Sequence, residues 1–155
     1  MNLQGAKIIV TGGSSGLGKA TAKSLKEKGA EVLITGRDSV KLKKVAQELG
    51  VKSLVFDVSD FNEIPSLSVQ MVKELNGVDV LINNAGIGEF ALLGDIKLEE
   101  FQRVFNTNVF GLTLLTQEIV KHFKKQKSGN IINIASTAYL KGFAHGSVYA
   151  ASKFA

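Results

Sequence analysis

The chain has 155 residues, of which 45% are hydrophobic and 21% are charged, and its formal net charge is +5. This length and composition fit one globular domain with its own core, and they exclude a largely disordered protein. The chain contains no Cys, which excludes disulfides and thiolate chemistry.

The positive charge comes from lysines that recur at helical spacing, as at Lys19, Lys23 and Lys26. Such clusters are typical of solvated helix faces, and neither aromatic residues nor a reading helix accompanies them, so we expect no nucleic-acid partner. We find no signal-peptide pattern and no apolar run long enough to span a bilayer. We therefore expect a cytoplasmic protein without a membrane partner.

Short apolar runs alternate along the chain with longer amphipathic stretches. We expect strands at Lys7–Thr11, Glu31–Thr35, Lys52–Asp57, Val78–Asn83 and Asn130–Ala135. Most of them are apolar throughout, which is typical of strands buried on both faces. The stretches between them follow helical spacing, and the longest pattern runs from Phe101 to Ile119. This order predicts an α/β fold with a doubly wound parallel sheet and right-handed crossovers.

A glycine-rich loop follows the first predicted strand and leads into a helix. Glycines let the backbone approach a bound phosphate, and the helix N-terminus offers free N–H groups. Directly after strand one of a βαβ unit, such a loop indicates a dinucleotide site. The residues that we expect to bind the cofactor here are Gly12, Ser14, Ser15, Gly16, Leu17 and Gly18.

Two other interpretations of this loop remain. Residues 13–19 also fit the frame of an NTPase P-loop, but Ala20 stands where that motif needs Ser or Thr to hold Mg²⁺. No second metal-binding Asp is evident, and we assign no metal ligand. The loop could also be a plain tight turn. The dinucleotide site is favoured over both.

The end of the second predicted strand bears on the choice of cofactor. An acidic residue near this point holds the ribose 2′-OH of NAD in many dinucleotide folds, but Gly36 has no carboxylate. Arg37 follows and can make a bidentate contact to a 2′-phosphate. Asp38 argues the other way, although we expect it to cap the next helix. The pattern favours NADP over NAD.

Tyr149 and Lys153 stand four residues apart near the end of the chain. In a helix this spacing puts the phenol and the ammonium on one face. A nearby cation favours the phenolate, so the pair predicts a Tyr that exchanges a proton at neutral pH.

Together these motifs resemble the short-chain dehydrogenase/reductase family over essentially the whole chain. Thr11–Gly18 matches the family's TGxxxGxG, Asn83–Gly86 its NNAG, and Asn108–Gly111 its NxxG. Ser136 precedes Tyr149 by thirteen residues, as the catalytic Ser of the family does, and Tyr149–Lys153 is its YxxxK. The resemblance implies a Rossmann-like fold.

The resemblance implies catalytic roles for four residues. Tyr149 would donate or accept the proton of the substrate oxygen. Lys153 would bind the nicotinamide ribose and favour the Tyr149 phenolate, so that both residues also contact the cofactor. Ser136 would hydrogen-bond the carbonyl, and Asn108 would hold a water in a proton relay to Lys153. A structural hydrogen bond at Asn108, an ordinary helix cap or turn at Ser136, and a surface aromatic at Tyr149 are the alternatives.

The resemblance also extends the cofactor site and defines the reaction. Asp57 and Val58 would lie by the adenine, and Asn84, Ala85 and Gly86 would line the cofactor at the fourth strand end. The implied activity is an NADP-preferring oxidoreductase that interconverts a hydroxyl and a carbonyl of a small molecule by hydride transfer. A dinucleotide-binding module or a truncated product without turnover is the alternative.

Family members normally continue well past the YxxxK helix with further strands and helices. We therefore expect residues 1–155 to form a single NAD(P)-binding domain that is incomplete at its C-terminal end. The fifth strand should then be an exposed edge, and the helix from Ser147 should be short. In the full-length form we expect a homo-oligomer.

Overall fold

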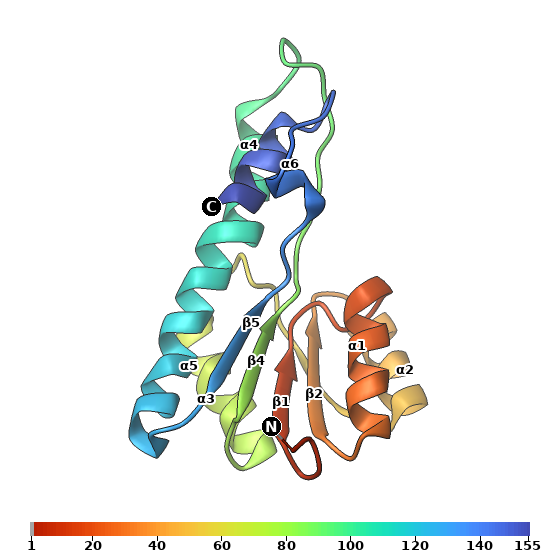
Figure 1. The fold of residues 1–155 in the computed structure, drawn as a ribbon, viewed down its shortest axis with the longest axis vertical. Helices are drawn as coiled ribbons and strands as arrows, with labels where there is room; N and C mark the ends of the chain where they lie inside the picture. The colour runs from red at the N-terminus through yellow and green to blue at the C-terminus, as the bar shows by residue number, and fades with distance from the viewer. Residues whose placement is uncertain (1) are drawn as a thin grey trace.

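A computed structural model describes residues 2–155, except for the side chain of Tyr139. Five parallel strands form one sheet in the order β3-β2-β1-β4-β5 (Figure 1). They are β1 (Lys7–Val10), β2 (Glu31–Gly36), β3 (Lys52–Val55), β4 (Val80–Asn83) and β5 (Asn130–Asn133). The strand order reverses between β1 and β4, which places a ligand crevice beyond the carboxyl ends of these two strands. The predicted doubly wound parallel sheet is confirmed.

Three of the predicted strands extend too far at their carboxyl ends. Thr11, Asp57 and Ala135 lie outside β1, β3 and β5. Just beyond the strand ends, Thr11 Oγ1 accepts from Asn84 N and Asp57 Oδ1 accepts from Ser59 N. These residues bring polar groups to the carboxyl edge of the sheet.

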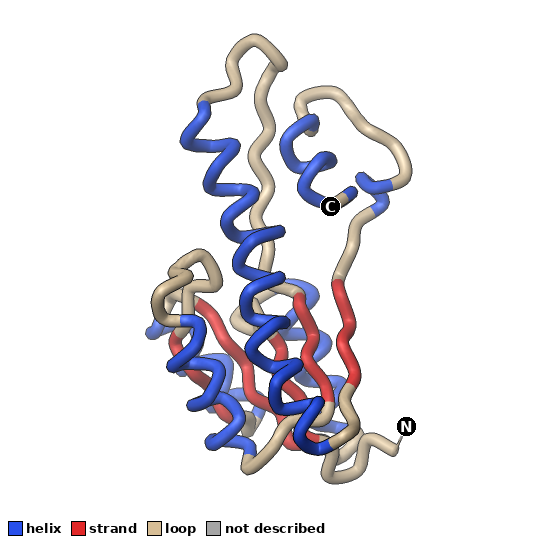
Figure 2. The backbone as a smooth tube through the Cα atoms, turned by 90° about the vertical axis from the view of Figure 1, so that its left-hand side faces the viewer, coloured by secondary structure: helices blue, strands red, loops and turns tan. Residues whose placement is uncertain are grey.

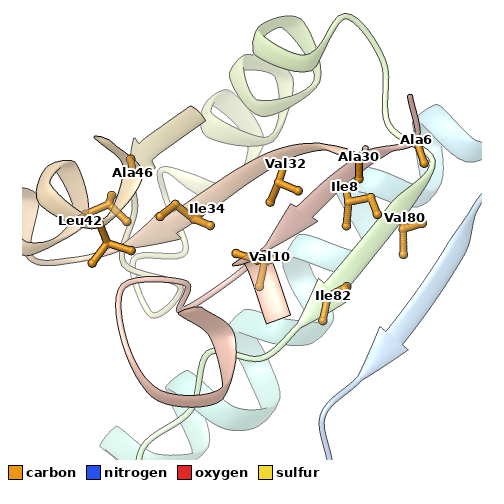
Figure 3. Close-up of a cluster of buried hydrophobic side chains, with 12 residues drawn as sticks. Ala6, Ile8, Val10, Ala30, Val32, Ile34, Leu42, Ala46, Val80 and Ile82 are labelled. Atoms are coloured by element: carbon orange, nitrogen blue, oxygen red, sulfur yellow. The ribbon is translucent and has the colours of Figure 1, made fainter. Parts of the chain in front are cut away.

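Helices cover both faces of the sheet. Helices α1 (Gly16–Glu27) and α2 (Ser39–Leu49) lie on one face, and α3 (Ile64–Leu75) and α5 (Leu112–Gln126) on the other (Figure 1). On the first face the alternate residues Ile8 and Val10 of β1 pack with Val32 and Ile34 of β2 (Figure 3). Ile9 and Leu33 point to the opposite core. Strands buried on both faces account for the apolar runs in the sequence.

One long helical segment continues from α4 (Leu98–Phe105) through a π-helical turn, η1 (Asn106–Gly111), into α5 (Figure 2). Helix α6 (Ser147–Phe154) follows a short 3₁₀ turn, η2 (Thr137–Tyr139), and packs beside α4. Among residues 2–155, no helix combines the length and apolar character needed to cross a membrane.

Strand β5 forms one edge of the sheet, as predicted, and all four of its residues are exposed. Ile131 and Ile132 point to opposite faces, and their exposed fractions are 41% and 47%. An apolar edge strand of this kind can pair with a further strand.

Candidate active site

The glycine-rich loop is fixed to the end of β4 by hydrogen bonds. Thr11 Oγ1 accepts from the backbone nitrogens of Asn84 and Ala85, each at 3.0 Å. The Asn84 side-chain nitrogen donates to the carbonyl oxygens of Thr11 (2.9 Å) and Gly12 (3.2 Å). Asn84 therefore shapes the loop in addition to lining the site.

Two positions in the loop require glycine. Gly12 has a φ of +66°, and a Cβ on it would lie 2.9 Å from Ala85 Cα. A Cβ on Gly18 would overlap the Gly12 carbonyl and the Asn84 amide. The loop and the end of β4 thus approach each other more closely than side chains allow.

Helix α1 begins without a side-chain cap. Ser15 is its N-cap residue, and its side chain makes no capping hydrogen bond. The first turn contains no acidic residue. The free N–H groups and the positive end of the helix dipole therefore remain available to an anion such as a phosphate.

A groove of about 330 Å³ runs along the carboxyl edge of the sheet. Predicted cofactor residues that line it are Gly12, Ser14, Ser15, Leu17, Gly18, Arg37, Asp57, Val58, Asn84, Ala85 and Gly86. Gly16 is outside this lining and is exposed at the start of α1. The groove also includes Thr35, Phe56, Ile87 and Thr107, which we did not predict. Thr35 and Phe56 could have been found from their positions at strand ends.

Arg37 lines this groove, and its neighbour Gly36 lies beside the glycine loop. A Cβ on Gly36 would lie 3.1 Å from Ser14 Oγ, so a larger side chain at position 36 would crowd the loop. Asp38 caps α2, as predicted, since its Oδ1 accepts from Lys41 N at 2.9 Å. Arg37 and Asp57 are the ionisable side chains among the described residues of this lining.

A second hollow, of about 380 Å³, adjoins the groove and contains Ser136, Tyr149 and Lys153. Residues common to both cavities are Leu17, Asn84, Gly86 and Ile87. Lys153 Nζ lies 6.0 Å from the centre of the Tyr149 ring and donates to Ile134 O at 3.0 Å. The structure therefore brings together three of the four residues that we predicted to be catalytic.

Ser136 caps the 3₁₀ turn, because its Oγ accepts from Ala138 N at 3.2 Å. The alternative that we kept open for Ser136, a turn residue, is thus present in the structure. A hydroxyl has one donor and two acceptor positions, so this bond leaves the O–H free to donate to a ligand. The structural role and the predicted role are compatible.

Asn108 is buried in η1 and bonds to the loop after β4. Its Oδ1 accepts from Ile87 N, and its Nδ2 donates to Ile87 O and to Ser152 Oγ, each at 2.9 Å. The structural hydrogen bond that we considered as an alternative is therefore present. π-Helical turns often occur at functional sites.

Gly111, at the other end of the Asn108–Gly111 motif, packs against the loop after β3. A Cβ on Gly111 would overlap Val58 O.

The sequence profile of the short chain dehydrogenase family matches residues 6–155. The chain belongs to this family. The glycine-rich loop lines the groove, and Ser136, Tyr149 and Lys153 line the adjoining hollow.

Two curated relatives in the family are similar over nearly the whole chain. A 3-oxoacyl-(acyl-carrier-protein) reductase FabG of Thermotoga maritima is 36% identical, over 99% of this chain and 64% of the relative. A 3-ketodihydrosphingosine reductase of Bacteroides thetaiotaomicron is 38% identical, over 96% of this chain and 53% of the relative. The chain thus spans between about half and two thirds of these relatives.

A solved structure of an NAD⁺-bound xylitol dehydrogenase has the same architecture. It superposes with a TM-score of 0.91 at 29% identity, and the match covers 99% of this chain and 62% of that one. The fold of this chain is therefore that of the matched part of this dehydrogenase.

Proposed function

We propose that this chain carries the cofactor site and the catalytic set of an NADP-preferring oxidoreductase. Its reaction would interconvert a hydroxyl and a carbonyl group of a small molecule. The adjacency of the two cavities carries the proposal, because the groove lined by Arg37 and the hollow at Tyr149 share four lining residues. An extended dinucleotide would occupy the groove and reach the hollow with its nicotinamide end.

The groove contains groups that fit each part of such a cofactor. The free N–H groups of α1 and the loop backbone would hold the pyrophosphate. Asp57 and Val58 would contact the adenosine half, and Gly86 would lie by the nicotinamide half. The bound nicotinamide supplies the hydride that the protein itself cannot supply.

Three side chains would manage the proton and the developing charge. Tyr149 would transfer a proton to or from the substrate oxygen, and the Lys153 ammonium lies on the same helix, 6.0 Å from the centre of the Tyr149 ring. Lys153 uses one donor on Ile134 O, so two remain for ribose hydroxyls. The Ser136 O–H would stabilise charge on the carbonyl oxygen.

The proposed role of Asn108 is to hold the site in place. Its side-chain oxygen and nitrogen both form hydrogen bonds with the backbone of Ile87, which lines both cavities. The water relay to Lys153 that the resemblance implies stays a prediction.

The preference for NADP rests on the residues at the end of β2. The xylitol dehydrogenase is NAD⁺-bound, so similarity alone favours neither cofactor. Arg37 supplies a guanidinium at the edge of the groove, and Gly36 leaves no carboxylate there to repel a 2′-phosphate.

A thermal-shift comparison followed by an activity assay tests the proposal. We expect NADPH to raise the melting temperature more than Mg-ATP does, and NADPH to be oxidised in the presence of a carbonyl compound. Stabilisation by Mg-ATP in preference to NADPH would refute the proposal in favour of an NTPase. Binding of NADPH without turnover of any carbonyl would support a dinucleotide-binding module instead.

A further inference from the structure

Phe90 lines the hollow that contains Tyr149, and Phe143, on a different loop, packs against the Phe90 ring. Phe90 follows β4, and Phe143 follows β5. Their ring centroids are 6.0 Å apart, and the Phe90 ring lies 5.9 Å from that of Tyr149. We call Phe90 and Phe143 the aromatic wall.

Both rings of the aromatic wall lie directly on glycine backbone. A Cβ on Gly88 would be 2.9 Å from the Phe90 ring and 3.6 Å from the Tyr149 ring. A Cβ on Gly146 would overlap the Phe143 ring. A larger residue at either position would displace the ring that lies on it, so the observed ring positions require glycine there.

The two loops that carry the wall are joined to each other and to α4. Ala91 N donates to His145 O at 2.9 Å, and Glu89 forms an ion pair with Arg103. His145 adopts a φ of +65°, a conformation that costs energy for a residue other than glycine. The loops are thus held together although neither belongs to a helix or strand.

The wall is not part of the core. Phe90 is 62% exposed and Phe143 is 47% exposed, so each presents much of its ring to solvent. Tyr149 and Lys153 are the ionisable residues among the described lining of the hollow, which contains no carboxylate or guanidinium in that set. Ile87 and Ile134 add further apolar surface there. Exposed aromatic surface beside a polar reacting group is the pattern of a pocket that orients an apolar ligand.

We propose that the aromatic wall binds a flat apolar substituent on the substrate, so that the preferred substrates are aryl ketones and the matching secondary alcohols. This inference rests on the proposed function, because it places the substrate oxygen at Tyr149. With the oxygen there, a ring attached to the carbonyl carbon would lie over Phe90 in an offset or tilted stack. Small anionic oxoacids find no guanidinium among the described residues of the hollow.

Ligand-observed NMR can test this inference. It would measure the binding of acetophenone and of pyruvate to the full chain loaded with NADP⁺. We expect acetophenone to bind more tightly than pyruvate. Phe90→Ala should weaken acetophenone binding by about tenfold, because it removes a stacked aromatic surface. Phe143→Ala should weaken it by a smaller factor.

Phe110→Ala is the matched control, because Phe110 is 50% exposed and also contacts another ring, that of Phe105, at 6.3 Å. It should leave acetophenone binding within about twofold of the parent. Phe90→Leu keeps apolar volume without the flat face, and we expect an intermediate affinity. If Phe90→Ala does not fold, Phe90→Leu still tests whether the aromatic face of Phe90 binds acetophenone.

The outcomes separate this inference from the proposed function. The proposed role of the aromatic wall would be overturned by equal affinity for pyruvate and acetophenone. It would also be overturned if acetophenone binding were unchanged in the Phe90 variants. NADPH-dependent reduction of pyruvate in preference to acetophenone would also overturn the wall but leave the proposed function standing. Acetophenone binding that depends on Phe90, without turnover, would support the wall and count against the proposed activity alone.

Discussion

The Asn108 side-chain nitrogen donates to Ser152 Oγ at 2.9 Å, and this bond joins the π-helical turn to helix α6. Ser152 directly precedes Lys153 in α6 and is buried, and its hydroxyl also donates to Tyr149 O at 2.8 Å. Because Asn108 bonds to both backbone groups of Ile87 as well, one amide connects the loop after β4 with the helix that carries the predicted catalytic pair.

Replacing Asn108 with Ala should loosen this connection. The backbone groups of Ile87 and the Ser152 hydroxyl would lose their partner, which costs about 1–3 kcal/mol of unfolding free energy. We also expect the Ile87 amide to exchange its hydrogen faster, as measured by NMR. Ser152→Ala removes one bond to Asn108 and should have the smaller effect, about 1 kcal/mol. An Ile87 amide that exchanges at the parent rate in Asn108→Ala would show that the amide does not hold the loop.

Tyr149→Phe should separate binding from chemistry. Without the hydroxyl, carbonyl reduction should fall by about two to four orders of magnitude, as expected for the loss of general acid catalysis. The groove beyond Tyr149 is unchanged, so fluorescence titration should still detect NADPH binding. Activity close to that of the parent would exclude Tyr149 as the proton donor.

Arg37→Ala should change the choice of cofactor. Loss of a charge-assisted hydrogen bond to the 2′-phosphate should weaken NADPH binding by about tenfold or more and leave NADH affinity nearly constant. Paired titrations with the two cofactors measure this directly. If NADPH keeps its full advantage in the variant, then the preference has another origin.

Gly111→Ala should destabilise the protein, because the new methyl group would overlap the carbonyl of Val58. Overpacking of this kind typically costs about 1–3 kcal/mol, which urea unfolding can measure. Gly94→Ala is the control, because a Cβ on Gly94 meets no atom within 4 Å. Equal unfolding free energies for the two variants would mean that the long helix can move away from Val58 at little cost.

The sheet and the glycine loop at its carboxyl edge could be predicted because their signals are local. Apolar runs such as residues 31–35 indicate buried strands, and the glycine loop follows its strand directly in the sequence. The cap at Asp38 depends on Lys41, only three residues away, and it was predicted correctly.

The partners of Asn108 could not be predicted, because they depend on long-range packing. Ile87 lies 21 residues before it, and Ser152 lies 44 residues after it. We predicted uniform helical spacing from Phe101 to Ile119 and did not predict the π-helical turn within it. Phe105 and Phe110 are five residues apart, yet their rings lie 6.3 Å from each other, because the π-turn shifts the helical register.

Residue-resolved NMR titration of the chain with NADPH tests the central claim, that the groove is a dinucleotide site, most directly. We predict the largest shifts at the amides of the glycine loop, Arg37, Asp57 and Gly86, and smaller shifts with NADH at Arg37. The claim would be contradicted if NADPH left these amides unshifted, or if Mg-ATP perturbed the glycine loop while NADPH did not.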